Sequence, residues 1–362
     1  MSVGLYVCSM SHFSGKTAVC VGLGRRLIRD GFSFGYLKPI SVLDQLRQAD
    51  SVDEDVRLLA KFSGQEALIE QMAPVRLNAQ ELDHVLLNEE LCGQYLRRLR
   101  EAYESICQER DVVILEGGGS LWEGSVINFS ASSLAQALGV PVLVVVKYVT
   151  DLQVVDDALA AQSVLGDTLL GVILNVVPPQ RKSALERAVV PAIRRRGVMV
   201  FAVLLEDMLL KAISVGEMAR ALQAEVLCAV QNQDELVENL MVGAMNVDAA
   251  LSYFRRKPNK AVFTGGDRLD IQLAALETST RCLVLTGNLP PSPVILSRAE
   301  ETGVPVVWAK QDTLTAVETI ENHFGKTRFH HQKKIDAFES MLEDCFNFEA
   351  LYASLHLSPA QR

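Results

Sequence analysis

The 362-residue sequence has little of what secretion, membrane insertion or nucleic-acid binding requires. Its seven cysteines are scattered and none forms a C-x-x-C pair, a pattern typical of reduced thiols in a cytoplasmic protein. The net charge of −9 argues against a nucleic-acid surface, because such surfaces are basic. No apolar run reaches the ~18 residues of a membrane span, and the N-terminus lacks the charged flank of a signal peptide. We therefore expect no membrane and no nucleic-acid partner.

Aromatic residues are scarce at 6%, whereas 49% of the residues are hydrophobic, which suits buried parallel strands covered by helices. Up to about residue 230, apolar runs alternate with amphipathic stretches. The runs that predict strands are 4–7, 33–37, 112–115, 140–146, 170–174 and 198–203. The stretches that predict helices include 17–29, 81–108, 130–138 and 182–196. This alternation indicates an α/β fold with a doubly wound, mainly parallel sheet, in which ligands bind beyond the carboxyl ends of the strands.

A second, smaller α/β domain follows a polar patch at residues 231–235. Its predicted strands are 260–264, 281–286 and 304–309, and its predicted helices are 269–277, 294–302 and 312–322. We predict domains at 1–231 and 232–350, with a tail at 351–362. The segment 333–355 is expected to be a helix that covers a face of the protein or of a partner.

A phosphate-binding loop is the most specific motif of the first domain. The segment from Ser9 to Thr17 ends in Gly15-Lys16-Thr17 and lies between a predicted strand and a predicted helix. The residues from Ser14 to Ala18 are candidates to hold a nucleotide, because backbone N–H groups of such loops converge on phosphate oxygens. Lys16 would reach the β- and γ-phosphates, and Thr17 would ligate Mg²⁺. Met10 replaces the first glycine of the motif, and the alternative is an ordinary turn with a surface lysine.

Charged residues follow the second predicted strand. Lys38, before Pro39, would point to the same end of the sheet as the loop and is, with Lys16, a candidate catalytic residue. An acidic cluster at residues 53–55 either caps a helix or supplies a carboxylate, that of Asp55, to Mg²⁺. The sequence leaves these two interpretations open.

Glu116 comes directly after an apolar strand and precedes Gly117, Gly118 and Gly119. A buried strand that ends in a carboxylate is the Walker B arrangement, which aims the acid at the metal, and the glycines would let the backbone approach a ligand. The alternative, a turn alone, needs only one glycine. At the end of a later strand, Asn175 could offer its amide to a purine edge or act as a turn residue.

These landmarks, in this order, resemble dethiobiotin synthetase and the cobyrinic acid a,c-diamide synthases over roughly residues 1–230. The resemblance implies a P-loop NTPase fold that holds Mg-ATP through the loop lysine and threonine, Asp55 and Glu116, with Asn175 at the adenine. The sequence departs from dethiobiotin synthetase at residues 9–12, Ser-Met-Ser-His, where that family has a Gly-Thr-Asp-Thr-type loop. This departure argues against carboxylation of the same substrate.

Residues of about 235–350 resemble the DRTGG domain, through 242–245, 263–271, 285–287, 303–306 and 312–313. A dethiobiotin-synthetase-like domain followed by a DRTGG domain is similar to the N-terminal region of long phosphate acetyltransferases and to shorter stand-alone proteins. The sequence ends where an acetyltransferase domain would begin, so we do not expect it to transfer acetyl groups itself.

The second domain carries a glycine-rich turn of its own, formed by Gly265, Gly266, Asp267 and Arg268. Asp267 could cap the following helix while Arg268 reaches a phosphate or carboxylate of an effector. The alternative is a tight turn in which the Asp–Arg pair is structural.

Three hypotheses follow for the whole protein. The first is an Mg-ATP-binding, or other purine-nucleotide-binding, regulatory protein that acts alone or beside a metabolic enzyme. The second is an ATP-dependent ligase of the dethiobiotin synthetase class, which activates a carboxylate. The third, a degenerate scaffold without a nucleotide, is disfavoured by Lys16, Thr17 and Glu116. We also expect a homo-oligomer, because a second domain of ~115 residues has a modest core and twofold dimers are common.

Overall fold

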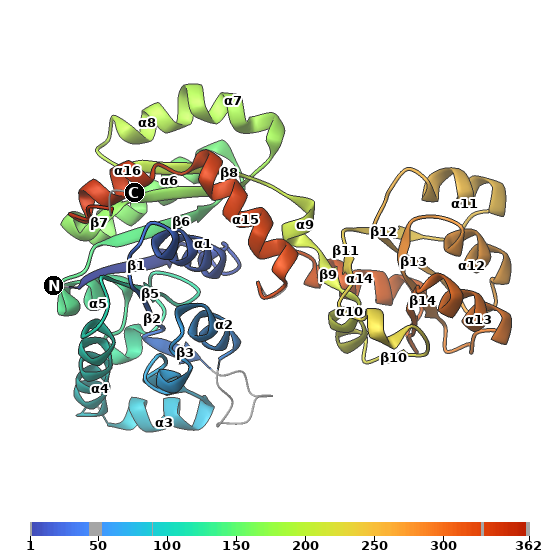
Figure 1. Ribbon diagram of the computed structural model, residues 1–362, viewed down its shortest axis with the longest axis horizontal. Coiled ribbons are helices and arrows are strands. Elements are labelled where there is room, and N and C mark those ends of the chain that lie inside the picture. The colour runs from blue at the N-terminus through green and yellow to red at the C-terminus, as the bar shows by residue number, and fades with distance from the viewer. Residues whose placement is uncertain (1, 43–52, 89, 327–328, 360–362) are drawn as a thin grey trace. The chain divides into compact units, whose positions relative to one another are not determined.

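The computed structural model describes residues 2–42, 53–88, 90–326 and 329–359 and divides the chain into two compact units. Unit 1 consists of Met1–Glu206 and Phe329–Arg362, and unit 2 of Asp207–Arg328 (Figure 1). The last residues of the predicted tail, 360–362, lie outside the described part. Among the described residues, no helix is both long and apolar enough to cross a membrane.

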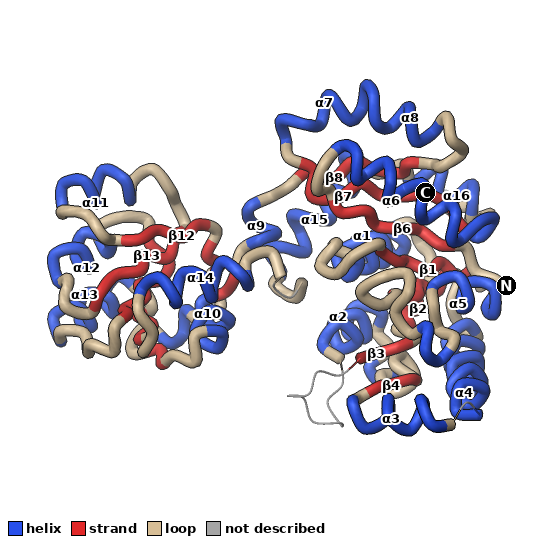
Figure 2. Tube along the Cα trace, turned by 180° about the vertical axis from the view of Figure 1, so that it is seen from behind, coloured by secondary structure: helices blue, strands red, loops and turns tan. Residues whose placement is uncertain are grey.

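Unit 1 is built on a six-stranded parallel sheet in the order β2-β5-β1-β6-β7-β8 (Figure 2). Its strands are β1 (Val3–Ser9), β2 (Phe34–Leu37), β5 (Val112–Glu116), β6 (Val142–Lys147), β7 (Leu169–Val177) and β8 (Val200–Leu205). β2, β5 and the first five residues of β6 are buried along their length, as continuous apolar runs require in a sheet covered on both faces. The predicted doubly wound α/β fold is therefore confirmed.

Helices flank this sheet. Those of the first segment that pack on its strands are α1 (Lys16–Arg29), α2 (Glu54–Ser63), α4 (Glu90–Cys107), α6 (Asp151–Leu165) and α8 (Val190–Arg194). Shorter elements are α5 (Ala131–Leu138), α7 (Lys182–Ala184), a π-helix at Leu185–Val189, and the parallel pair β3 (Ile40–Val42) and β4 (Val75–Leu77). The sheet thus lies between helical layers and presents its carboxyl strand ends to the connecting loops.

Two helices that were predicted as single elements before residue 206 are divided in the structure. The segment 81–108 forms α3 (Ala79–Leu87) and α4, because the side chain of Asn88 accepts a hydrogen bond from Glu90 N at 3.1 Å and so begins a new helix. The segment 182–196 contains the π-helix, and Pro191 is the second residue after it. A proline within a helix has no N–H to donate, and a widened turn accommodates it.

The C-terminal helices α15 (Gln332–Cys345) and α16 (Phe348–Ser354) belong to unit 1, although unit 2 precedes them in the sequence. α15 packs along α1, and both helices pack on β8. Leu342 fits against Gly22 of α1, where a Cβ atom would overlap its side chain. Phe346 stacks on Phe201 of β8 at 5.7 Å between ring centroids. The segment 333–355, predicted as one helix, thus forms two helices, and they cover a face of unit 1 as predicted.

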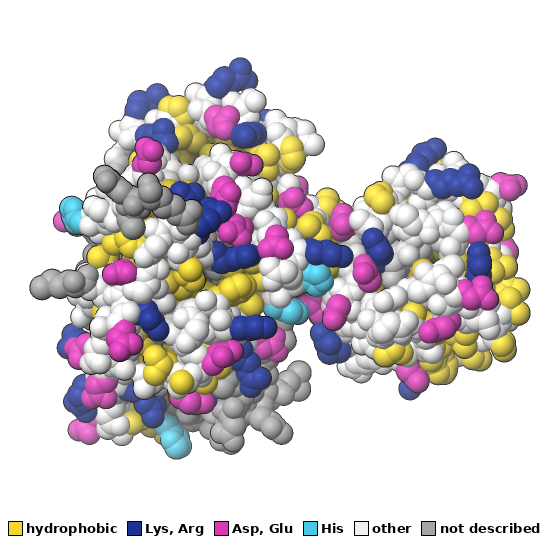
Figure 3. All heavy atoms as spheres, in the orientation of Figure 1, with side chains coloured by type: hydrophobic (Ala, Val, Ile, Leu, Met, Phe, Trp, Pro, Cys, Tyr) yellow, Lys and Arg dark blue, Asp and Glu magenta, His cyan; other side chains and the backbone are white. Residues whose placement is uncertain are grey.

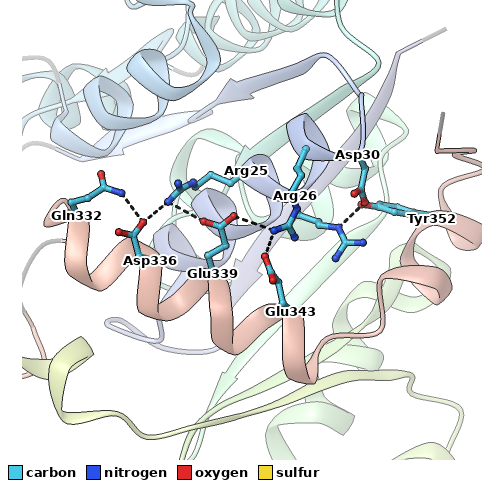
Figure 4. A network of polar contacts seen from close by, with 9 residues as sticks. Arg25, Arg26, Asp30, Gln332, Asp336, Glu339, Glu343 and Tyr352 are labelled. Atoms are coloured by element: carbon cyan, nitrogen blue, oxygen red, sulfur yellow. Dashed lines mark hydrogen bonds and ion pairs between the residues drawn. The ribbon is translucent and has the colours of Figure 1, made fainter. Parts of the chain in front are cut away.

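Ion pairs border the contact between α1 and α15 (Figure 4). Arg25 Nη1 lies 2.9 Å from Asp336 Oδ1 and 3.0 Å from Glu339 Oε2, and Arg29 also pairs with Glu339 and Glu343. The first segment of unit 1 ends at Glu206, and residues 332–354 return to cover α1 and the edge strand β8. The sequence-based boundary at 231/232 therefore lies inside unit 2, and a fragment 1–231 would lack these two helices.

Unit 2 contains a five-stranded sheet in the order β10-β15-β14-β13-β12. The strands β12 (Asn239–Val242), β13 (Lys260–Gly265), β14 (Thr280–Thr286) and β15 (Val306–Trp308) are parallel, and β10 (Glu225–Val226) is antiparallel to β15. The helices are α9 (Met208–Lys211), α10 (Val215–Ala221), α11 (Val247–Phe254), α12 (Leu269–Leu276), α13 (Pro293–Thr302) and α14 (Thr313–His323), with a short pair β9 (Ile213–Ser214) and β11 (Leu236–Val237).

Two apolar clusters form the core of unit 2, one on each face of its sheet. The first joins α10 and α14 to residues such as Phe263 and Val284, and the second joins α11, α12 and α13 to residues such as Val262 and Leu283. Neighbouring strand residues alternate between the clusters, as the pleat of a strand requires. The predicted second α/β domain is therefore confirmed.

Candidate functional site

The loop between β1 and α1 ends in a glycine, Gly15, that no other residue could readily replace. Gly15, the last residue before α1, adopts φ +93°, a backbone conformation that residues other than glycine rarely adopt. A Cβ atom here would also overlap the side-chain amide of Asn175. Two independent constraints therefore require glycine at this position.

Lys16 begins α1 and is only 9% exposed. Its Nζ atom donates a hydrogen bond to Ser9 Oγ at 2.9 Å, and Ser9 Oγ donates to the carbonyl of Ser11 at 2.9 Å. The ammonium group is thus held at the loop by the last residue of β1. The sequence analysis did not assign Ser9, although its place at the end of a strand directly before the loop is a usable signal.

Thr17 and Glu116 are in direct contact. Thr17 Oγ1 donates to Glu116 Oε1 at 2.6 Å, and the hydroxyl of Tyr36 donates to Oε2 at 2.8 Å. Glu116 is 2% exposed, and burial raises the pKa of its carboxyl group, with Asp55 acting in the same direction. The structure thus brings together the two residues that the sequence had assigned to one metal ion. Tyr36 was missed, because a tyrosine in an apolar strand gives no functional signal.

Lys38 is held by two carboxylates. Its Nζ lies 2.8 Å from Asp53 Oδ2 and 3.0 Å from Asp55 Oδ2, and its side chain is 13% exposed. Burial lowers the pKa of Lys38, but the charges of Asp55, Glu116 and Asp53 outweigh it and raise the pKa. Lys38 therefore stays protonated, and its positive charge interacts both with the acidic cluster and with Glu116.

The acidic cluster at residues 53–55 caps the helix that follows it. Asp53 is the N-cap of α2 and accepts a hydrogen bond from the backbone N–H of Asp55 at 2.9 Å. The capping interpretation therefore holds for Asp53. The carboxylate of Asp55 points to Lys38 instead, and its role as a metal ligand stays a prediction.

The three glycines after Glu116 are required by protein side chains. A Cβ atom on Gly117 would lie 2.9 Å from Cys8 Sγ, one on Gly118 would overlap Glu123, and one on Gly119 would overlap the ring of His12. Close approach to a ligand is therefore not needed to explain them. His12, which the sequence analysis did not assign, packs on Gly119 and so connects the phosphate-binding loop to the loop after β5.

Asn175 braces the phosphate-binding loop. Its Nδ2 donates to the carbonyl of Ser14 at 2.8 Å, and its Oδ1 accepts from Val176 N at 2.9 Å. Val176 has φ +59°, which is strained for a β-branched residue and is the kind of strain found at functional sites. Each end of the amide thus makes one bond within the protein and keeps the capacity for one more, and the contact with a purine edge stays a prediction.

The polar groups around Lys16 are of the kinds that bind phosphate and a hard cation. The hydroxyl of Ser14 is buried and has no hydrogen-bond partner, although it lies in the loop whose backbone would surround a phosphate. The hydroxyl of Thr17 and the carboxylate of Glu116 are the oxygen ligands that Mg²⁺ prefers. Within the described ranges, no group of three or more His, Cys, Asp or Glu side chains is arranged to hold a metal by itself.

In unit 2, the turn from Gly265 to Arg268 differs in part from its prediction. The N-cap of α12 is Arg268, and no side chain caps this helix, so the prediction that Asp267 caps it is wrong. Arg268 does not pair with Asp267 but with Asp270 at 3.2 Å and with the carbonyl of Met245 at 2.9 Å. Gly266 lies against the backbone of Leu289, which a Cβ atom would overlap.

The surface carries charges of both signs. On the face shown in Figure 3, basic side chains are interspersed with acidic ones over both units. This mixture is consistent with the acidic net charge of −9.

A parallel α/β sheet with a Gly-Lys-Thr loop before α1, and with Thr17 bonded to a strand-end glutamate, defines a P-loop type of domain, here joined to a second α/β domain. Residues 3–240 match the model of a family described as AAA domain, and the chain belongs to this family. Residues 217–323 match the DRTGG domain.

The chain is similar to phosphate acetyltransferases and to dethiobiotin synthetases. The chain is 26% identical to the phosphate acetyltransferase of Nitratidesulfovibrio vulgaris over 95% of its own length and 50% of the relative. It is 25% identical to the phosphate acetyltransferase of Synechocystis sp. over 84% of its own length and 44% of the relative. It is 30% identical to the ATP-dependent dethiobiotin synthetase of Aromatoleum aromaticum over 50% of its length and 80% of the relative. The chain thus spans about half the length of the phosphate acetyltransferases that it matches, and the resemblance to both groups is confirmed.

Proposed function

We propose that unit 1 binds a purine nucleotide, ATP with Mg²⁺, at the loop around Lys16. The observation that carries the proposal is the hydrogen bond of 2.6 Å between Thr17 and Glu116, which joins the loop to the carboxylate at the end of β5. These two groups lie together beside a buried lysine, as a site for phosphate and its cation requires. The relationship to an ATP-dependent dethiobiotin synthetase favours ATP among the nucleotides.

The residues divide into three tasks in this proposal. The backbone from Ser14 to Ala18 and the ammonium of Lys16 hold the phosphates, since N–H groups at the start of a helix favour anions. Thr17 and Glu116 hold Mg²⁺, with Asp55 as a further oxygen ligand. Gly117 and Gly118 let their loop pack closely beside the site, and Asn175 keeps the phosphate-binding loop in place through Ser14. Bound Mg²⁺ would neutralise phosphate charge.

We propose a regulatory or accessory role beside a metabolic enzyme, related to that of the matched part of phosphate acetyltransferases. The DRTGG domain attached to the P-loop domain supports this role over that of a free-standing ligase. A homo-oligomer, most simply a dimer, is part of the proposal, and light scattering that reports only the 39.7 kDa monomer at micromolar concentration would contradict it.

One observation favours the second candidate, an ATP-dependent ligase that activates a carboxylate. Lys38 carries a buried positive charge close enough to Glu116 to shift its titration, and such a charge could stabilise a transferred phosphoryl group. The loop residues Ser9 to His12 do not match the substrate-type loop of dethiobiotin synthetase, which places this candidate second. ADP release that depends on an added carboxylate substrate would reverse the order.

Titration of ATP with Mg²⁺ into the wild type and the Lys16→Ala variant tests the proposal. Loss of a charge-assisted phosphate contact worth ~1.5–3 kcal/mol should weaken binding about tenfold or more. Lys61→Ala, which removes an exposed lysine of α2, is the matched control and should bind as the wild type does. Equal affinities for the wild type and Lys16→Ala would refute the assignment.

A further inference from the structure

A buried glutamine lies at the carboxyl end of β13 in unit 2. Gln272 of α12 has no exposed surface, and its Nε2 donates to the carbonyl of Gly265 at 2.8 Å. Because a carbonyl oxygen must face a donor, this bond determines which end of the amide is nitrogen. The oxygen Oε1 therefore also lies at the turn between β13 and α12.

This oxygen has no hydrogen-bond partner. Gln272 Oε1 is buried and unbonded, whereas two threonine hydroxyls near the same turn are satisfied. Thr264 Oγ1 donates to the carbonyl of Gly243 at 3.2 Å, and Thr286 Oγ1 donates to the carbonyl of Thr264 at 3.2 Å. A buried acceptor without a donor is costly, and proteins rarely retain one without a reason.

The start of α12 lies beside this oxygen. Its N-cap residue, Arg268, gives no side-chain cap, and the carboxylate of Asp270 accepts hydrogen bonds from the backbone N–H groups of Ile271 and of Asp270 itself. Arg268 is held at this turn by the carbonyl of Met245 and by Asp270, with its side chain 36% exposed. Positive charge and backbone donors thus lie next to an acceptor that needs a donor.

We propose that this turn of unit 2 binds a small organic anion that carries a hydroxyl or amino group. The anionic group, a phosphate or a carboxylate, takes the place of the exposed carboxylate of Asp270 at the N-terminus of α12 and at Arg268. The hydroxyl or amino group donates to Gln272 Oε1. The site lies at the carboxyl ends of parallel strands, where open α/β sheets bind their ligands (Figure 1). The proposal deepens the regulatory role proposed above by naming the ligand class of unit 2, and it uses no residue of unit 1.

A segment covers the turn and has to move for a ligand to enter. Leu289 lies over Gly266, and an atom without exposed surface is reached only when a covering segment gives way. The segment begins with Gly287 at φ +82° and Asn288 at φ +54°, two successive left-handed residues that mark a sharp bend. Ligand binding should therefore change amide hydrogen exchange at residues 287–289 and 292, since residues 290 and 291 are prolines without an N–H.

The test uses the full chain with the Lys16→Ala substitution, so that phosphate binding in unit 1 is weakened. AMP, glycerol 3-phosphate and phosphoserine are the hydroxyl- or amino-bearing probes, and methyl phosphate is the matched anion without such a group. We expect at least one probe to bind about tenfold more tightly than methyl phosphate in calorimetry. Absence of binding by all three probes at 10 mM overturns the proposal.

Two variants locate the binding. Gln272→Leu removes the acceptor at similar volume, and Arg268→Gln removes the charge from a partly exposed position that the fold tolerates. Each should weaken the best probe about tenfold. Gln65→Leu, which removes another buried amide without partners, but in unit 1, is the control and should leave binding unchanged. If Gln272→Leu only stabilises the chain and binding persists in both variants, the orphan oxygen is a packing defect and the proposal fails.

The outcome is separable from that of the nucleotide proposal. Titration of ATP with Mg²⁺ into Gln272→Leu with Lys16 intact should match the wild type, because the two sites share no residue. Loss of ATP binding in Lys16→Ala together with no probe binding would refute the unit 2 site alone. Probe binding in a chain that never binds ATP would refute the unit 1 site alone.

Discussion

Asn175 donates a hydrogen bond of 2.8 Å to the carbonyl of Ser14, a residue 161 positions earlier in the sequence. This bond ties the end of β7 to the phosphate-binding loop. Because Asn175 is 6% exposed, water cannot replace the bond without opening the site.

Replacement of this asparagine should loosen the loop. In Asn175→Asp, an acceptor would face the Ser14 carbonyl, and the unpaired buried groups should lower the free energy of unfolding by ~1–3 kcal/mol. Affinity for ATP with Mg²⁺ should fall as well, since a disordered loop must be ordered on binding. Urea denaturation and calorimetry measure both effects, with Asn322→Asp at an exposed position of α14 as the control. A variant with unchanged stability would show that the bond contributes nothing.

Glu116→Gln should have opposite effects on stability and on binding. Burial raises the pKa of the carboxyl group, so the folded state disfavours the charged form, and stability declines as pH rises through the unfolded value of 4.5 toward the folded one. At neutral pH, the variant should therefore be more stable than the wild type. Its Mg²⁺-dependent affinity for nucleotide should fall about tenfold, because a charge-assisted ligand is lost.

The pH profile of the wild type checks the same residue. A proton competes with Mg²⁺ for Glu116, and the raised pKa moves this competition above the ordinary glutamate range. Nucleotide affinity in the presence of Mg²⁺ should decline on acidification at a higher pH than 4.5, and Glu116→Gln should flatten this part of the profile. An identical decline in both proteins would remove Glu116 from the metal site.

The contact between α15 and α1 should be held by apolar packing more than by its ion pairs. Leu342 is 1% exposed and fills the space above Gly22, so Leu342→Ala should cost ~2–5 kcal/mol. Arg25 pairs with Asp336, whose side chain is 55% exposed, so Arg25→Ala should cost about 0–1 kcal/mol. Urea unfolding of the two variants measures the difference, and a larger loss for Arg25→Ala would contradict this ranking.

Lys260, at the start of β13, should make unit 2 more stable at alkaline pH. Its amine is buried without a hydrogen-bond partner, 6.0 Å from the centre of the Phe254 ring, and burial lowers its pKa from 10.5 to about 8. Between these two values the unfolded chain binds a proton that the folded chain does not, so stability rises with pH, by ~1.4 kcal/mol per pKa unit of difference. The measurement is the pH dependence of unfolding of the wild type relative to Lys260→Met, in which this rise should be absent. Parallel profiles would show that Lys260 has an ordinary pKa in the folded protein.

Local patterns in the sequence determined much of the fold and of the site. The apolar runs that end at Val7, Leu115 and Val146 predicted central strands, since continuous apolar segments are stable only where both faces are covered. Gly15, Lys16, Thr17 and Glu116 were identifiable because their chemistry depends on neighbours in the sequence, a loop before a helix and an acid after a strand.

Only the tertiary structure decided which distant residues complete these elements. The pairing of Tyr36 with Glu116, the packing of His12 on Gly119 and the bond from Asn175 to Ser14 join positions whose separation in the sequence carries no periodic signal. The return of residues 332–354 to cover α1 and β8 was decided in the same way, since an amphipathic helix shows that it needs an apolar partner but not which one. Hydrophobic burial is non-directional, and the three-dimensional packing of the whole unit selects the partner.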